Sequence, residues 1–237
     1  MYSLDEIVAA LDPDQGIPAP VETADEHLIA HFNRIIDSLP HAEQEVPVID
    51  IPSPKWLFFR HVVQRRLALL HGSNNTDIDE FIPRMSNCAS EEGNQEAIYA
   101  SSDPLQPIFY AVVNRRIEHP FAVTGIIKPP DTMNPLTLYY FSTSILSQEA
   151  EYWTQGAVYL LPTSSFIEDS HGVQWRSATP VKPLAKVIVI KNDFPFADII
   201  PRFNLDKYMT RMSENLTGCP WYDNPDLTPV NTKKSPD

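Results

Sequence analysis

The sequence predicts an α+β fold in which acidic helices precede a strand-rich body. Apolar residues recur at helical spacing near the N-terminus. Between residues 121 and 190, short apolar runs alternate instead with clusters of Pro, Asn, Asp and Gly. Hydrophobic residues make up 43% of the 237 residues and charged residues 21%. This composition is sufficient for one large domain with a buried core.

Two amphipathic helices are expected in the first forty residues. Ser3 and Glu6 form a capping-box pattern, and the residues after them are apolar at helical spacing until the next proline. A second helix is expected from Thr23 to Leu39, with Thr23 and Glu26 as its capping box. Its apolar stripe is expected either to pack on the body or to dock a basic partner.

The middle of the chain is expected to alternate helix and strand. A third helix follows Ser53, which is its expected cap. A buried strand over residues 67–70 then ends in a turn, and a second strand covers residues 97–100. A fourth helix starts at residues 102–104 and ends at Arg115 and its basic neighbour, whose charge complements the helix dipole.

The rest of the body is expected to be mostly strand. Strands are predicted over residues 121–127, 136–143, 157–161, 173–176 and 181–190. A last helix is expected over residues 196–212. The predicted organisation is an acidic helical segment over residues 1–50, an α+β domain over residues 51–215 and a loose tail over residues 216–237.

The net charge of −13 lies mostly in the N-terminal segment. Residues 1–50 hold eleven acidic residues and one basic residue, Arg34, so the remaining chain is close to neutral. This distribution argues against an electrostatic footprint for nucleic acid. The acidic segment is expected to bind a basic protein partner or to lie over the body as an inhibitory lid.

Several common functional classes are not expected. No apolar run reaches the roughly 18 residues that span a bilayer, and the N-terminus lacks a signal-peptide pattern, so we expect a soluble, cytoplasmic protein without membrane contact. Cys88 and Cys219 are too few for a disulfide framework. The chain has no Walker A loop, no G-x-G-x-x-G loop and no G-x-S-x-G elbow.

Two further local patterns carry little functional weight. His27 and His31 have the spacing of zinc ligands on a helix, but the residues between them supply no general base, and we predict no metal site. Asn74 matches the N-glycosylation acceptor pattern, which we interpret as chance.

The strongest functional signal lies in the two predicted middle strands and the helix after them. His71, Gly72 and Ser73 follow a buried strand, and the missing side chain of Gly72 lets a ligand approach the backbone. Tyr99 lies at the matching point of the next strand, and Tyr110 follows eleven residues later. This order resembles the ADP-ribosyltransferase superfamily, in particular its poly(ADP-ribose) polymerase-like branch with a histidine, tyrosine, glutamate triad.

The resemblance implies a split body of two small sheets that binds NAD as a substrate, with no metal. His71 would hydrogen-bond the adenosine ribose. The backbone of Gly72, with Ser73, would grip the nicotinamide carboxamide. Tyr99 and Tyr110 would stack against the nicotinamide ring.

The resemblance is weakest at the third member of the triad. The family's glutamate, on a later strand, stabilises the oxocarbenium-like transition state. The strand after residue 173 offers Gln174, which keeps the hydrogen-bonding geometry and loses the charge. Glu149 and Glu151 are alternative carboxylates, and Arg84 would reach the pyrophosphate.

The expected function is transfer of ADP-ribose from NAD to an acceptor that the sequence does not identify, or hydrolysis of NAD. A glutamine at the third position argues for slow chemistry, for a different division of labour, or for binding without turnover. The alternative is a non-catalytic α+β binding module whose acidic N-terminal helices engage a basic protein partner.

Overall fold

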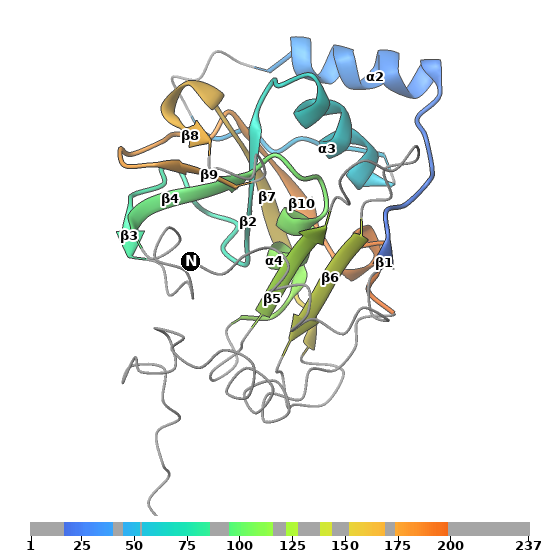
Figure 1. Cartoon of the computed structure of the whole chain (residues 1–237). Coiled ribbons are helices and arrows are strands. Elements are labelled where there is room, and N and C mark those ends of the chain that lie inside the picture. The colour runs from blue at the N-terminus through green and yellow to red at the C-terminus, as the bar shows by residue number, and fades with distance from the viewer. Residues whose placement is uncertain are drawn as a thin grey trace, which may run out of the picture.

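The computed structural model describes residues 17–39, 45–52, 54–85, 95–115, 122–127, 138–143, 152–168 and 174–198. These residues include three α-helices and two antiparallel sheets, which confirms the predicted α+β class (Figure 1). Outside the described residues lie the predicted first helix, most of the predicted last helix, Ser53, Cys88, Cys219, Glu149 and Glu151. No helix in the described ranges is long and apolar enough to cross a bilayer.

All three described α-helices begin later than the sequence predicts, and the helix expected after Ser53 has Pro54 at its N-cap position. The helices are α2 (Glu26–Asp37), α3 (Lys55–Gln64) and α4 (Gln106–Val112). Asp25, rather than Thr23, caps α2, because its carboxylate accepts a hydrogen bond from the backbone N–H of Leu28 at 2.8 Å. Asp103 acts in the same way before α4, where its carboxylate accepts from two backbone N–H groups.

The prediction that the fourth helix continues to Arg115 is wrong. Helix α4 ends at Val112, and the next residue, Val113, has an extended backbone. The side-chain amide of Asn74 donates hydrogen bonds to the carbonyl groups of Ala111 and Val113, so a residue from a different element satisfies the end of the helix. Arg115 therefore lies beyond the helix.

The strands form a larger and a smaller sheet. The larger sheet has the order β10-β7-β2-β4-β9-β8, with β3 paired to β4, and the smaller has the order β1-β6-β5. The strands of the larger sheet are β2 (Leu69–Ser73), β3 (Arg84–Met85), β4 (Glu96–Ser101), β7 (Gly156–Leu161), β8 (Ile167–Glu168), β9 (Gln174–Ser177) and β10 (Ala185–Val189). Those of the smaller sheet are β1 (Ile17–Pro18), β5 (Ala122–Ile127) and β6 (Leu138–Thr143).

The predicted strands are present, but two have different ends. Strand β2 continues through His71, Gly72 and Ser73, so the turn predicted there is wrong. All three residues are in register with β7, whose pairing extends the strand. Strand β10 covers only the second half of the strand predicted over residues 181–190, and Val181 forms an isolated bridge instead.

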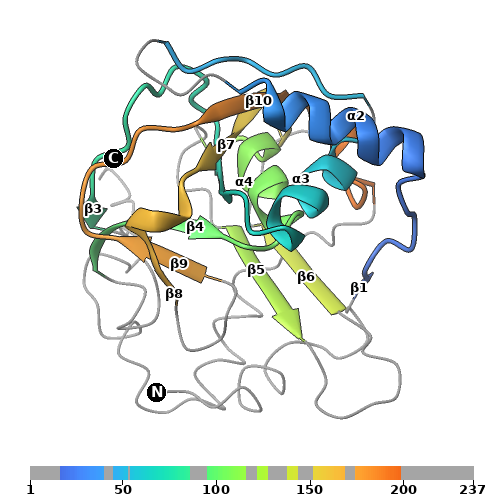
Figure 2. The same cartoon turned by 90° about the horizontal axis from the view of Figure 1, so that it is seen from above.

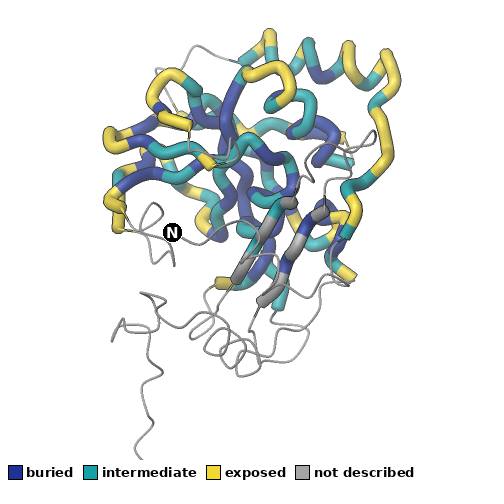
Figure 3. The backbone as a smooth tube through the Cα atoms, in the orientation of Figure 1, coloured by how far each residue is buried: buried dark blue, intermediate teal, exposed yellow. Residues whose placement is uncertain are grey.

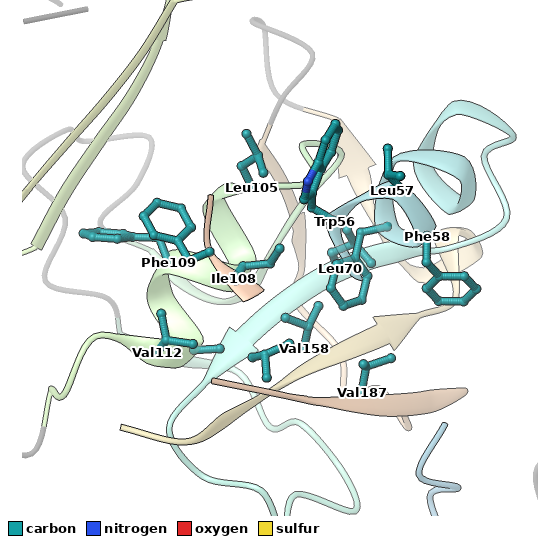
Figure 4. Close-up of a cluster of buried hydrophobic side chains, with 14 of the residues drawn as sticks. Trp56, Leu57, Phe58, Leu70, Leu105, Ile108, Phe109, Val112, Val158 and Val187 are labelled. Atoms are coloured by element: carbon teal, nitrogen blue, oxygen red, sulfur yellow. The ribbon is translucent and has the colours of Figure 1, made fainter. Parts of the chain in front are cut away.

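Helices α3 and α4 contribute to the main core with one face of the larger sheet (Figure 2). Their apolar side chains meet those of β2, β7 and β10, as Figure 4 shows for Trp56, Phe58, Leu70, Ile108, Phe109, Val158 and Val187. A smaller apolar cluster lies on the opposite face around Phe81 and Tyr159. Strand β7 is consequently buried along its whole length (Figure 3).

The apolar stripe of α2 packs on the body. Phe32 is fully buried, and its ring meets that of Phe58 on α3 edge to face, with 5.3 Å between the centroids. The outer face of α2 is exposed (Figure 3). For α2, this confirms the prediction that the apolar stripe packs on the body.

Strand β2 is paired unequally on its two edges. Toward β7, the register runs without a break from Leu69 with Leu161 to Ser73 with Ala157. Toward β4, the register joins the strands at one pair, Leu70 with Ser101. Strands β2 and β4 therefore separate near His71.

Candidate functional site

His71 bridges the separation between β2 and β4. Its Nδ1 lies 2.6 Å from the backbone oxygen of Tyr99, and its ring packs against Phe81 with 4.6 Å between centroids. The side chain is partly buried. The imidazole thus satisfies a backbone carbonyl at the place where strand pairing stops.

The contact with Tyr99 also fixes the proton on the His71 ring. Burial, above all, lowers the pKa of His71 from 6.5 to about 4, the charge of Arg115 lowers it further, and the hydrogen bond to Tyr99 opposes the change. The ring is therefore neutral near pH 7. A carbonyl oxygen only accepts, so Nδ1 carries the hydrogen and Nε2 is left as an acceptor.

Gly72 lies directly beneath helix α4. A Cβ atom at this position would lie 1.8 Å from the backbone oxygen of Pro107. Gly156 on β7 is equally close to α4, because a Cβ there would lie 2.0 Å from the backbone oxygen of Ala111. The backbone of α4 therefore fills the space beside Gly72, and the missing side chain serves helix packing rather than the expected approach of a ligand.

Asn74 holds the end of α4 against β2. It is 7% exposed, and its Nδ2 donates to the backbone oxygens of Ala111 and Val113, both at 2.8 Å. Its Oδ1 accepts from the backbone N–H of Arg115 at 2.8 Å. A buried amide with these structural bonds fits the interpretation of its glycosylation pattern as chance.

The Arg115 side chain reaches back over the site. Its Nη2 donates to the backbone oxygen of Gly72 at 3.3 Å, and its guanidinium carbon lies 5.5 Å from the ring centroid of Tyr110. The residue as a whole remains exposed. The guanidinium of Arg115 therefore contacts the Gly72 backbone and the Tyr110 ring, which the family resemblance assigns to binding of nicotinamide.

Tyr110 is anchored by a chain of polar side chains. Its hydroxyl lies 3.1 Å from Oγ1 of Thr124 on β5, which also accepts from Nε2 of Gln106 at 3.1 Å. Gln106 Oε1 in turn accepts from the Ser101 hydroxyl at 3.2 Å. The chain connects β4, α4 and the smaller sheet, and it fixes the position of the Tyr110 ring.

Tyr99 and Gln174 lie on the same face of the sheet. Gln174 is the cross-strand partner of Ser101, and Arg176 is the partner of Tyr99. Gln174 and Tyr99 are thus diagonal neighbours, a relation that places such residues about 7–8 Å apart. By strand alternation His71 belongs to the opposite face, where Phe81 lies, and it meets Tyr99 through the backbone.

The remaining candidate residues are less closely associated with this group. Arg84 is exposed on β3, opposite Ala97. The Ser73 hydroxyl accepts from the backbone N–H of Asn75 at 3.1 Å. The Tyr99 hydroxyl is bonded to the backbone of Gln95. Within the described ranges no group of three or more His, Cys, Asp or Glu side chains could hold a metal ion.

Comparison with protein-family models, curated proteins and solved structures finds no match to this chain. Function must therefore be inferred from the site and from the resemblance of its residues.

The site contains residues that the sequence analysis missed. Asn74 directly follows the three-residue motif, and a polar residue next to a buried strand was a usable signal. Arg115, Gln106 and Thr124 gave no signal, because their roles depend on contacts between distant elements.

Proposed function

We propose that the chain is an ADP-ribosyltransferase-like protein that binds NAD where β2 and β4 separate and transfers ADP-ribose from it. The contact of 2.6 Å between His71 Nδ1 and the Tyr99 oxygen carries this proposal. It selects the neutral ring whose Nε2 accepts, and a ribose hydroxyl is a donor of the matching kind. A charged ring would offer two donors instead.

The surroundings of Gly72 support a place for the nicotinamide group. The nicotinamide ring of NAD is a planar cation, and its carboxamide carries an N–H₂ donor. The guanidinium of Arg115 has the same two properties, and it lies against the Gly72 oxygen and the Tyr110 ring. The chemistry of these two groups therefore suits nicotinamide.

The transfer itself breaks the bond between the nicotinamide nitrogen and C1′ of the ribose. The bonding electron pair leaves with nicotinamide, which becomes neutral, and the positive charge passes to the ribose. A nucleophile of the acceptor, or water, then donates a lone pair to C1′ and loses a proton. Gln174 would hydrogen-bond a ribose hydroxyl without supplying negative charge, so we expect slow turnover.

A competing interpretation is that His71 serves only the fold, because it satisfies the Tyr99 carbonyl. The substitution His71→Asn separates the two roles. The Asn amide nitrogen takes the place of Nδ1 and keeps a donor for Tyr99, whereas the acceptor at Nε2 is lost. A structural role predicts a folded variant with unchanged NAD binding.

The test is calorimetric titration of NAD into the full chain, with nicotinamide release measured in parallel. We expect wild type to bind NAD and His71→Asn to bind at least about tenfold more weakly, the effect of one lost hydrogen bond of about 1.4 kcal/mol. NAD binding without nicotinamide release would favour binding without turnover over transfer of ADP-ribose. No binding and no release by wild type would refute the proposal.

A second substitution tests the third position. Gln174→Glu restores the charge that the family places on a later strand, so nicotinamide release should rise by on the order of 10²-fold. Gln64→Glu is the control, because Gln64 is exposed on α3 and lies outside the residues assigned to the site. An unchanged rate in Gln174→Glu would show that Gln174 is not the third member.

A further inference from the structure

We propose that Arg115 occupies the place of the nicotinamide group in the unliganded protein and competes with that group for it. This inference rests on the proposed function, which supplies the identity of the ligand. It adds an internal competitor that sets how tightly the site binds.

The two contacts of the Arg115 side chain carry the inference. Nη2 donates to the Gly72 oxygen at 3.3 Å, and the guanidinium carbon lies 5.5 Å from the Tyr110 centroid. A nicotinamide group would use the same carbonyl as its acceptor and the same ring for stacking. Two planar groups cannot cover one face of a ring, and two cations there would also repel each other.

The backbone of Arg115 is fixed to the strand that carries Gly72. Asn74 follows Ser73 at the end of β2, and its Oδ1 accepts from the Arg115 N–H at 2.8 Å. The same Asn74 side chain bonds the end of α4 through two carbonyl groups. The backbone of Arg115 is therefore held beside the site whenever the protein is folded.

The guanidinium is joined to the site by its two side-chain contacts, with the Gly72 oxygen and the Tyr110 ring. Arg115 as a whole is exposed, whereas burial of its guanidinium lowers the pKa of that group. Turning the side chain into water would therefore restore hydration that the guanidinium loses in the site. At 3.3 Å, the hydrogen bond to the Gly72 oxygen is slightly longer than usual for N–H···O. An arrangement of this kind favours exchange of the guanidinium for a ligand.

The experiment titrates nicotinamide into wild type, Arg115→Ala and Arg34→Ala. Nicotinamide is neutral, so the change in protein charge has little direct effect on its binding. Arg34 is exposed on α2, so Arg34→Ala matches the charge change away from Gly72. Arg115→Ala keeps the backbone N–H that donates a hydrogen bond to Oδ1 of Asn74, so we expect the fold to be retained.

We expect the Kd of nicotinamide to fall about fivefold to twentyfold in Arg115→Ala, because one hydrogen bond and one cation–π contact no longer compete. Arg34→Ala should bind as wild type does. Ethylguanidinium added to Arg115→Ala should occupy the vacated place and weaken nicotinamide binding again. The amide NMR signal of Gly72 would report that occupation directly.

Two negative outcomes have different meanings. If wild type binds nicotinamide and Arg115→Ala binds it equally or more weakly, Arg115 is no competitor, and only this inference is overturned. If neither protein binds nicotinamide or NAD, the proposed function is refuted together with it.

Discussion

The two edges of β2 satisfy their backbone groups in different ways. Toward β7, the register is continuous from Leu69 to Ser73. Toward β4, one strand pair is followed by side-chain contacts, with His71 at the Tyr99 oxygen and Arg115 at the Gly72 oxygen. Backbone pairing produces a permanent scaffold, whereas side chains are able to exchange places with a ligand. The difference places His71 and Arg115 where side chains, rather than a neighbouring strand, satisfy backbone carbonyl groups.

Substitution of either glycine beneath α4 should have the largest effect. In Gly72→Ala, the new Cβ would meet the Pro107 oxygen at 1.8 Å, and in Gly156→Ala it would meet the Ala111 oxygen at 2.0 Å. Each overpacked contact should lower the free energy of unfolding by about 3 kcal/mol or more. Denaturant unfolding measures the effect.

Gln155→Ala is the surface control for these glycine substitutions, because Gln155 is exposed directly before β7. The close approach of α4 to the scaffold would be contradicted by a Gly72→Ala protein as stable as that control. Equal losses at both glycines would show that α4 packs on β2 and β7 alike.

The edge of β2 toward β4, the open edge of this strand, should make stability depend on pH. The pKa of His71 is lowered from 6.5 to about 4 in the native protein. Between these two pH values the unfolded chain binds a proton at His71 and the native protein does not. The free energy of unfolding should therefore fall as pH drops from 6.5 to about 4, by about 3 kcal/mol at 1.36 kcal/mol per pH unit. Below that range both states are protonated, and the contribution stays lost.

His71→Asn removes this titration and keeps a donor for Tyr99. Its unfolding free energy, measured from pH 7 to pH 4, should decline less steeply than that of wild type. The comparison must be between the two proteins, because burial also lowers the pKa of His61 and adds a slope of the same sign to both. Parallel pH profiles would mean that His71 is not held neutral.

The types of the longer elements could be predicted from the sequence, but the short strands β1, β3 and β8 and the ends of several elements could not. Periodicity is a local property, so α2 and the strands of the body were found from their apolar patterns. The ends depend on distant partners. Asn74 bonds the last carbonyls of α4, and pairing with β7 extends β2 through Ser73. No local pattern encodes these contacts.

The candidate site was predicted in part for the same reason. The order of His71, Tyr99 and Tyr110 along the chain indicated three adjacent elements, and β2, β4 and α4 are adjacent. The role of Gly72 in packing α4 and the return of Arg115 over Tyr110 required the fold. The sequence indicated that Arg115 ends α4 and complements the helix dipole, because no local pattern shows that Asn74 bonds the end of the helix earlier.

Asn74 connects the end of α4 and the backbone of Arg115 to strand β2. Asn74→Ala would remove three hydrogen bonds of a buried side chain and leave the Ala111 and Val113 carbonyls without these donors. We expect a loss of about 2 kcal/mol in unfolding free energy. Thermal or denaturant unfolding measures it.

Asn75→Ala is the neighbouring control, because Asn75 is exposed and its side chain bonds only a nearby backbone N–H in the described structure. If the two variants were equally stable, Asn74 would not be the residue that fixes α4 and Arg115 to β2.

The smallest effect is expected at the outer wall of the site. Tyr110→Phe removes the hydroxyl that meets Thr124 and keeps the ring, so stability should fall by about 1 kcal/mol while nicotinamide affinity stays within a fewfold of wild type. Tyr110→Leu removes the ring as well, and nicotinamide binding should weaken by about tenfold, as expected for the loss of a stacking contact of about 1.4 kcal/mol. Titration of both variants separates the anchor from the stacking surface. Equal nicotinamide affinities in Tyr110→Phe and Tyr110→Leu would mean that the Tyr110 ring contributes nothing to nicotinamide binding. The proposed stacking contact beside β2 would then be wrong.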